Sequence, residues 1–193
     1  MKKKTLLIAV MAIALAVVTA ASVTVAWLTA ESNQVTNTFT YGKIEIELNE
    51  TSNHDSIEIK SDGIAFSHVV PGDKINKVPV VTVKEGSEAC YVYVLVTNGL
   101  DGVATYDITT PWEVVATGTN GKVLYRYGKS AVNALDAAQP LTVFTTVSFP
   151  TTLTATDVAA LTGNITIKAY AHQADNSSMA ESDANVKTYY GLN

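Results

Sequence analysis

The residues of this chain that could do metal chemistry are three histidines, His54, His68 and His172. None of them belongs to an HExxH pattern, and neither a cysteine nor another histidine stands at zinc-ligand spacing from any of them. A zinc site would therefore need three dispersed histidines to converge in space. We predict ordinary polar roles for His68 and His172, and we expect no metal and no cofactor.

The sequence motifs that commonly carry catalysis are missing. There is no GxSxG nucleophile elbow, no Walker phosphate loop and no GxGxxG dinucleotide loop. The segment DGVATYD at 101–107 has two acids but lacks the ligand series of a calcium-binding EF-hand, which favours a surface turn. The single cysteine, Cys90, lies in the most apolar strand candidate, where a buried and inert thiol is expected. We therefore expect that the protein is not an enzyme.

Aromatic side chains remain as candidates for ligand contact. The pairs Tyr91/Tyr93 and Tyr125/Tyr127 could line a ligand surface, although tyrosines in a sheet more often pack with a solvated hydroxyl. Trp112 begins a strand candidate, and we expect it in the core. A ligand-binding role would be favoured by tyrosines that gather on one exposed face.

The charge argues against a nucleic-acid partner, and the cysteine content excludes an intramolecular disulfide. The chain has 193 residues and a formal net charge of −5. Removal of the first 26 residues deletes three lysines and no acids, which leaves ten basic residues against eighteen acidic ones and a net charge of −8. Nucleic acid is a poor candidate partner, because phosphate binding needs clusters of Lys and Arg and no basic run follows Lys4. One cysteine permits no intramolecular disulfide, so an exported form must depend on its core.

The N-terminal segment has the three parts of a secretory signal. Lys2–Lys4 form a basic region, an uncharged run covers residues 5–29, and small residues stand at cleavage spacing. Cleavage could follow Ala20 or Ala21, or it could follow Ala26. The same run is long enough to span about 30 Å of hydrocarbon as an uncleaved anchor. In either case we expect the rest of the chain outside the cell membrane, with the basic end inside.

The segment that follows the signal changes its pattern at a glycine. In VTNTFTY, Val35, Phe39 and Tyr41 share one face with the polar Asn37, and threonines line the other face, as in a half-buried strand. In KIEIEL, directly after Gly42, the apolar positions are even-numbered instead of odd-numbered. A regular strand cannot change parity without exposing one apolar set. We predict a bulge, kink or turn at Gly42, and the segments on its two sides could belong to different sheets or to different molecules.

Short strand candidates, about ten in all, fill the rest of the chain. The strongest is ACYVYVLVTN at 89–98, which is apolar on both faces and is expected at the centre of a sheet, covered on both sides. Pro79 predicts an edge position for the strand at 77–83, and TNG at 119–121 predicts a hairpin turn. This pattern favours an all-β fold, either a two-sheet β-sandwich or a barrel.

Helical signals are few. Residues 130–138 could form a short helix, and residues 156–163 could form another with Thr156 as its N-cap. From Asp175 the chain is polar, and we expect residues 176–193 to form a tail that frays.

Several stretches match the pattern of a known group. An N-T-F-x-x-G element and an alternating strand follow the signal, at Asn37, Thr38, Phe39 and Gly42 and then at Ile44, Ile46 and Leu48. VVPGDKINKVPVVTVKEGSEACYVYVLV and the later LTVFTTVSFP and ITIKAYAHQAD match its core and late strands. In these stretches, spread discontinuously over residues 5–175, the chain resembles the TasA/camelysin-like family of bacterial exported proteins, whose signals are cut by a specialised SipW-type signal peptidase.

The resemblance implies a jelly-roll-like two-sheet β-sandwich in a secreted protein of the extracellular matrix or cell surface. It also implies cleavage after Ala26, so that Trp27 begins the mature chain. In TasA-like biofilm fibres the N-terminal segment of one subunit adds as a strand to the next subunit, and such head-to-tail exchange builds open filaments. The implied partners are other copies of the chain or a related fibre protein, together with the signal peptidase. The membrane would be met only through the signal segment.

We therefore expect residues 1–26 to be a signal, 27–42 an N-terminal arm, 43–175 the sandwich and 176–193 a tail. The function expected is a structural subunit of matrix fibres, with Val35, Asn37, Phe39 and Tyr41 in a donated strand. Two alternatives stay open, namely a camelysin-like surface metalloprotease and a monomeric jelly-roll module that binds a ligand such as a glycan.

Overall fold

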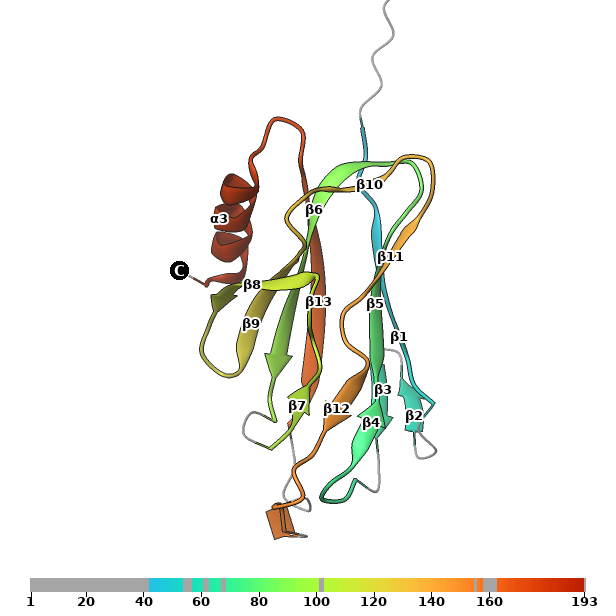
Figure 1. Cartoon of the computed structure of the whole chain (residues 1–193), viewed down its shortest axis with the longest axis vertical. Coiled ribbons are helices and arrows are strands. Elements are labelled where there is room, and N and C mark those ends of the chain that lie inside the picture. The colour runs from blue at the N-terminus through green and yellow to red at the C-terminus, as the bar shows by residue number, and fades with distance from the viewer. Residues whose placement is uncertain are drawn as a thin grey trace, which may run out of the picture. The chain divides into compact units, whose positions relative to one another are not determined.

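The computed structural model of the chain describes residues 42–53, 57–60, 63–66, 69–100, 103–154, 156–157 and 163–192. The predicted signal, its Ala26–Trp27 cleavage site and the donor-strand residues Val35, Asn37, Phe39 and Tyr41 lie outside these residues. Within them, no helix is long and apolar enough to cross a membrane. They form an all-β fold of antiparallel sheets, as the strand pattern predicted (Figure 1). A short C-terminal helix accompanies the strands.

One sheet has three strands in the order β1-β5-β11. These are β1 (Ile46–Thr51), β5 (Val78–Val83) and β11 (Gln139–Thr142), all antiparallel. The edge position predicted from Pro79 is wrong, because β5 is the central strand. The ladder between β11 and β5 ends at Thr142 and Val80, and the carbonyl of Pro79 accepts from the N–H of Val143 just beyond it. The donor that Pro79 lacks therefore falls past the end of β11, where it interrupts no ladder.

The larger sheet is built around the twelve-residue strand β6 (Ser87–Asn98). One side of β6 pairs with β13 (Ile165–Gln173), and the other pairs with β9 (Lys122–Tyr127). The short strand β10 (Val132–Ala134) pairs with the beginning of β6, and β8 (Trp112–Thr117) forms the outer strand next to β9. The prediction that the strand at 89–98, which is β6, is central is confirmed.

Two small sheets and one hairpin turn complete the description of the strands. A three-stranded sheet contains β4 (Lys74–Asn76), β12 (Thr146–Ser148) and β7 (Thr105–Tyr106), and a hairpin contains β2 (Ile57–Lys60) and β3 (Gly63–Phe66). The predicted hairpin between β8 and β9 is present. Asn120 and Gly121 both have positive φ, 59° and 69°, as a two-residue hairpin turn requires. A Cβ on Gly121 would lie 2.2 Å from the carbonyl oxygen of Asn98, so only glycine fits there.

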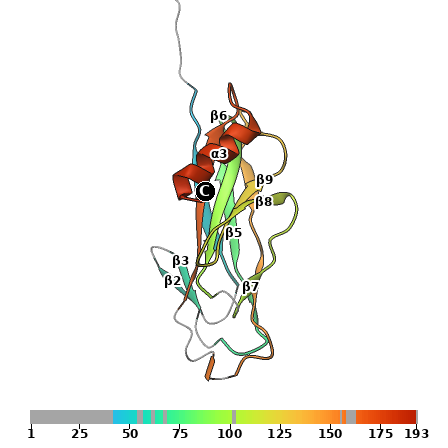
Figure 2. The same ribbon diagram turned by 90° about the vertical axis from the view of Figure 1, so that its left-hand side faces the viewer.

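Both faces of β6 are covered, as its two apolar faces predicted. Cys90, Val92, Val94 and Val96 are fully buried in the core between the sheets, with residues such as Val81 from β5. The alternate residues Tyr93 and Leu95 belong to a second buried cluster on the outer face, together with Leu124, Val186 and Leu192. The outer face is covered by the helix α3 (Met179–Tyr190), which lies in front of β6 in Figure 2.

The expectation of a fraying tail over residues 176–193 is wrong, because α3 occupies most of it. Ser178 caps the helix through a capping box with Glu181, and Gly191 ends it in the left-handed conformation. Val186 is fully buried against the sheet. The segment is polar because α3 buries only Ser182 and Val186, so its composition did not indicate a packed helix.

The other helical expectations fare differently. The helix expected at 130–138 is wrong: Val132 and Ala134 are buried strand residues that pair with β6, and this pairing outweighs a weak helical preference. Of residues 156–163, only Thr156, Asp157 and Gly163 are described, and the first two are helical. Thr154, and not Thr156, exchanges the capping hydrogen bonds with Asp157.

Candidate strand-acceptor edge

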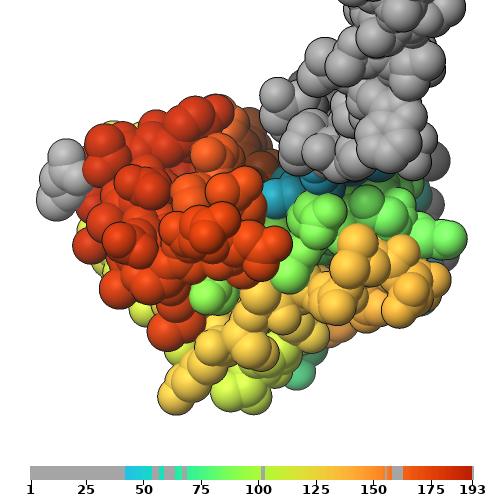
Figure 3. Space-filling model, turned by 90° about the horizontal axis from the view of Figure 1, so that it is seen from above, coloured from blue at the N-terminus to red at the C-terminus, as the bar shows by residue number. Residues whose placement is uncertain are grey.

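The outer strands of the two sheets, β1 and β13, lie beside each other on one side of the sandwich. Seen from above, the first described residues, in blue, border both the C-terminal part of the chain, in red, and a green segment from the middle of the chain (Figure 3). Among the described residues, β1 forms a ladder only with β5, and β13 forms one only with β6. Both strands therefore present a second edge toward the same seam.

The side chains of β1 that face the core are only partly covered. In the ladder with β5, Ile46 stands opposite Val83 and Leu48 stands opposite Val81. Opposed residues share a face of the sheet, so these two side chains point inward with their partners. Val81 and Val83 are fully buried, whereas Leu48 is 37% exposed. The core is thus open to one side along β1.

The same contrast is present along β13. Its inward-facing residues Ile167, Ala169 and Ala171 stand opposite Val96, Val94 and Val92 of β6. The three valines are fully buried, but the β13 residues are only partly buried. Two of the three are alanines, which leave space that larger side chains would fill. An apolar strand laid along this seam would bury inward-facing surface on both β1 and β13.

The residues just before β1 connect the two sheets. The carbonyl of Glu45 accepts from the N–H of Lys84, at the end of β5, and the carbonyl of Lys43 accepts from the N–H of Glu88, in β6. A Cβ on Gly42 would lie 2.6 Å from Cγ of Glu88. A glycine therefore fits this close approach to β6. Gly42 is also the residue at which the apolar positions change from odd to even numbers.

Of the three histidines considered as metal ligands, the structure describes His172. His54 and His68 lie outside the described residues. His172 contacts α3, with Nδ1 3.0 Å from Oγ of Ser182 and Nε2 3.4 Å from Nδ2 of Asn185. In the part of the chain that the structure describes, no group of three His, Cys, Asp or Glu side chains could hold a metal ion.

A hollow of about 360 Å³ lies between the strands near Trp112 and Tyr127. As expected, Trp112 is buried, and its indole N–H donates to the carbonyl of Thr142 at 2.7 Å. Asp107 also lines the hollow, but its carboxylate accepts from Thr145 and Thr146. Burial opposes ionisation of Asp107, and these hydrogen bonds outweigh it, so its pKa is lowered. The carboxylate is thus a fixed acceptor and a poor general base.

Tyr91 and Tyr93 do not form an exposed ligand surface. Both belong to the cluster under α3, and the Tyr93 hydroxyl donates to Asp183 at 2.8 Å. The hydroxyl of Tyr125 lies 3.0 Å from that of Tyr106. The tyrosine that is exposed among the described residues is Tyr189, at the end of α3, in a segment that the sequence pattern had assigned to a tail. The S-x-x-E cap at Ser178 was the signal that could have revealed it.

The thiol of Cys90 is expected to be unreactive in the folded protein. Its side chain is fully buried, and burial raises its pKa to about 11. Since the thiolate is the reactive form, an aromatic disulfide reagent at pH 8 should leave Cys90 unmodified for hours and react within minutes once denaturant unfolds the chain. Rapid labelling of the native protein, measured by absorbance, would contradict this assignment.

Comparison with known proteins gives no match: no family model, no curated protein and no solved structure is similar to this chain.

Proposed function

We propose that the protein is an exported structural subunit of extracellular matrix fibres, with a jelly-roll arrangement of its sandwich. In this proposal the signal is cut between Ala26 and Trp27, and the freed arm of one subunit adds as a strand to the β1–β13 seam of the next. The observation that carries the proposal is the partial exposure of inward-facing side chains on β1 and β13, beside ladder partners that are fully buried. The sandwich would be completed by a strand from outside.

The arm has the pattern that such a strand needs. Val35, Phe39 and Tyr41 alternate on one face, and a strand added at an edge gains backbone hydrogen bonds while alternate side chains set its register. The receiving side offers alanines at 169 and 171, where aromatic side chains from the arm could enter. Because donor and acceptor lie on different parts of the chain, the contact is heterologous and builds an open filament.

The test is electron microscopy of the mature protein with and without residues 27–41, after mass spectrometry has established its N-terminus. We expect filaments from the intact mature chain and none from the shortened one. Filaments that persist unchanged without the arm would refute strand donation. A mature chain that begins before Trp27 would refute cleavage after Ala26, and one that keeps the whole signal would refute the freed arm.

Paired substitutions on opposite faces of the arm, and on opposite faces of β1, distinguish strand insertion from a general effect of charge. Phe39→Asp should prevent assembly, whereas Thr38→Asp, on the opposite face of the same strand, should permit it. On the acceptor, Leu48→Glu should prevent assembly and Asn49→Glu should not, because Leu48 faces the core and its neighbour faces away. Equal effects of the two members of a pair would show that charge alone, and not strand insertion, controls assembly.

A further inference from the structure

Three tyrosine rings meet where the last turn of α3 lies against β13. The ring centres of Tyr170 and Tyr189 are 4.9 Å apart, those of Tyr189 and Tyr190 are 5.0 Å apart, and those of Tyr170 and Tyr190 are 6.3 Å apart. Tyr189 is 67% exposed, more than any other large hydrophobic side chain of the described residues. Burial, with the two neighbouring tyrosines, raises the pKa of Tyr190 to about 12, so its hydroxyl remains protonated at neutral pH.

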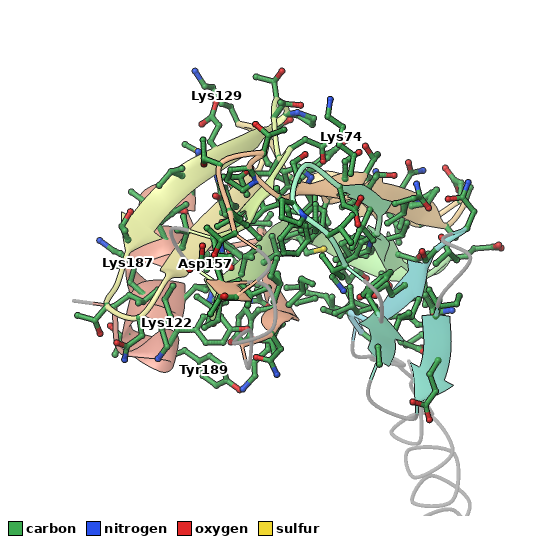
Figure 4. The ribbon with its side chains drawn as sticks, turned by 90° about the horizontal axis from the view of Figure 1, so that it is seen from below. Lys74, Lys122, Lys129, Asp157, Lys187 and Tyr189 are labelled. Carbon is green, nitrogen blue, oxygen red and sulfur yellow. The ribbon has the colours of Figure 1, made fainter. Side chains whose placement is uncertain are left out.

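Three lysines lie on the elements that carry this cluster or next to them. Lys168 precedes Tyr170 by two residues on the same face of β13, and Lys187 lies in the last turn of α3. Lys122 begins β9 beside Gly118, and Leu192, which follows the helix, touches the same glycine. Figure 4 shows Lys122, Lys187 and Tyr189 on the same side of the fold, away from Lys74. We call these three tyrosines and three lysines the aromatic–lysine patch.

The charge of the patch contrasts with that of the whole chain. Residues 118–122, 163–173 and 184–192 contain the three lysines and no Asp or Glu, although the chain has a net charge of −5. Within the described part of the structure, these lysines form no ion pair, whereas Lys43, Lys77, Lys84 and Lys129 each do. The three lysines therefore give an acidic protein a local positive charge, and no acidic side chain of the described residues pairs with them.

We propose that the aromatic–lysine patch binds an acidic polysaccharide, one that carries carboxylates on its sugar rings. Aromatic rings with polar hydroxyls can pack against the apolar faces of sugars while hydrogen bonding to their edges, and lysine ammonium groups bind carboxylates. A nucleic acid fits less well, since binding its phosphate backbone needs a cluster of more than three Lys and Arg side chains. Stabilisation of the helix end by Lys187 accounts for neither Lys168 nor the exposure of Tyr189.

Binding can be measured by electrophoresis of the protein, purified from the cells that express it, through gels containing polygalacturonate. Parallel gels contain neutral dextran or single-stranded DNA. We expect retardation by polygalacturonate only, and a dissociation constant about tenfold higher for Tyr189→Ala. The double variant Lys168→Gln/Lys187→Gln should bind at least as weakly and lose the salt dependence of the native protein.

Two substitutions elsewhere on the surface serve as controls. Leu135→Ala removes a side chain that is 47% exposed, and Lys74→Gln removes an exposed lysine that has no ion pair among the described residues. Both should bind polygalacturonate within about twofold of the native protein. The proposal is overturned if the native protein is not retarded, if the patch variants bind as it does, or if DNA retards it more than polygalacturonate does. Lys168 and Tyr170 belong to β13, but they stand opposite Leu95 and Tyr93 on its outer face, whereas the seam is lined by inward-facing residues. Loss of fibre assembly would therefore leave this result unaffected.

Discussion

Replacement of Asp183 by alanine is expected to lower the free energy of unfolding by about 3 kcal/mol, because it leaves a buried arginine short of a partner. Arg126 is only 8% exposed at its side chain and lies under α3. Its guanidinium group donates to Asp183 on the helix and, at 2.9 Å, to Glu113 on β8. The second oxygen of Asp183 accepts from Tyr93, which is fully buried.

A loss of about 3 kcal/mol is at the lower end of the range for a broken buried ion pair, because Glu113 still faces Arg126 after the substitution. Urea denaturation followed by circular dichroism gives the free energy, with the slope of the transition showing whether unfolding stays two-state. Lys129→Ala is the matched control. Lys129 approaches Glu113 at 3.6 Å with its side chain 79% exposed, so its loss should cost less than about 0.5 kcal/mol. A loss below about 1 kcal/mol for Asp183→Ala would mean that α3 is held by its apolar contacts alone.

The importance of α3 also shows where prediction from sequence reached its limit. The alternation of the strand at 89–98 predicted that both of its faces are covered, and this is confirmed, but the pattern did not reveal what covers the outer face. The covering helix has few apolar residues, and only Val186 and Ser182 are buried within it. Much of its attachment depends on Arg126 and Asp183, which are 57 residues apart in sequence. Periodicity reports faces within an element and carries no information about such distant polar pairs.

The sequence predicted only part of the β1–β13 seam, for a related reason. The apolar faces of β1 and β13 follow from alternation at Ile44, Ile46 and Leu48 and again at Ile165 and Ile167. Which strands lie at the edges does not follow, because it depends on pairing order over long sequence separations. The strand with Pro79 was expected at an edge and lies at the centre, since its missing donor falls beyond the end of the neighbouring ladder.

Glu50→Ala is expected to destabilise the protein by about 3–4 kcal/mol, because it isolates a buried lysine. The side chain of Lys77 is 9% exposed and forms an ion pair with Glu50, which is 16% exposed. Glu50 lies in β1 and Lys77 directly precedes β5, so this pair helps to hold β1, one of the two strands of the β1–β13 seam, to β5. Removal of the carboxylate leaves an ammonium group in a poorly solvated site, where desolvation exceeds any remaining attraction.

A double substitution distinguishes the value of the pair from the cost of breaking it. One carboxylate oxygen of Glu50, Oε1, is buried and has no hydrogen-bond partner among the described residues, so the pair is imperfectly compensated. Replacement of both partners by apolar residues of similar size, Glu50→Leu with Lys77→Met, should therefore restore the stability of the native protein or exceed it. Glu47→Ala removes the more exposed pair with Lys84 and should have a far smaller effect. If the double variant were as unstable as Glu50→Ala, the attachment of β1 would depend on the ion pair itself, and assembly at the seam would then weaken as salt is raised.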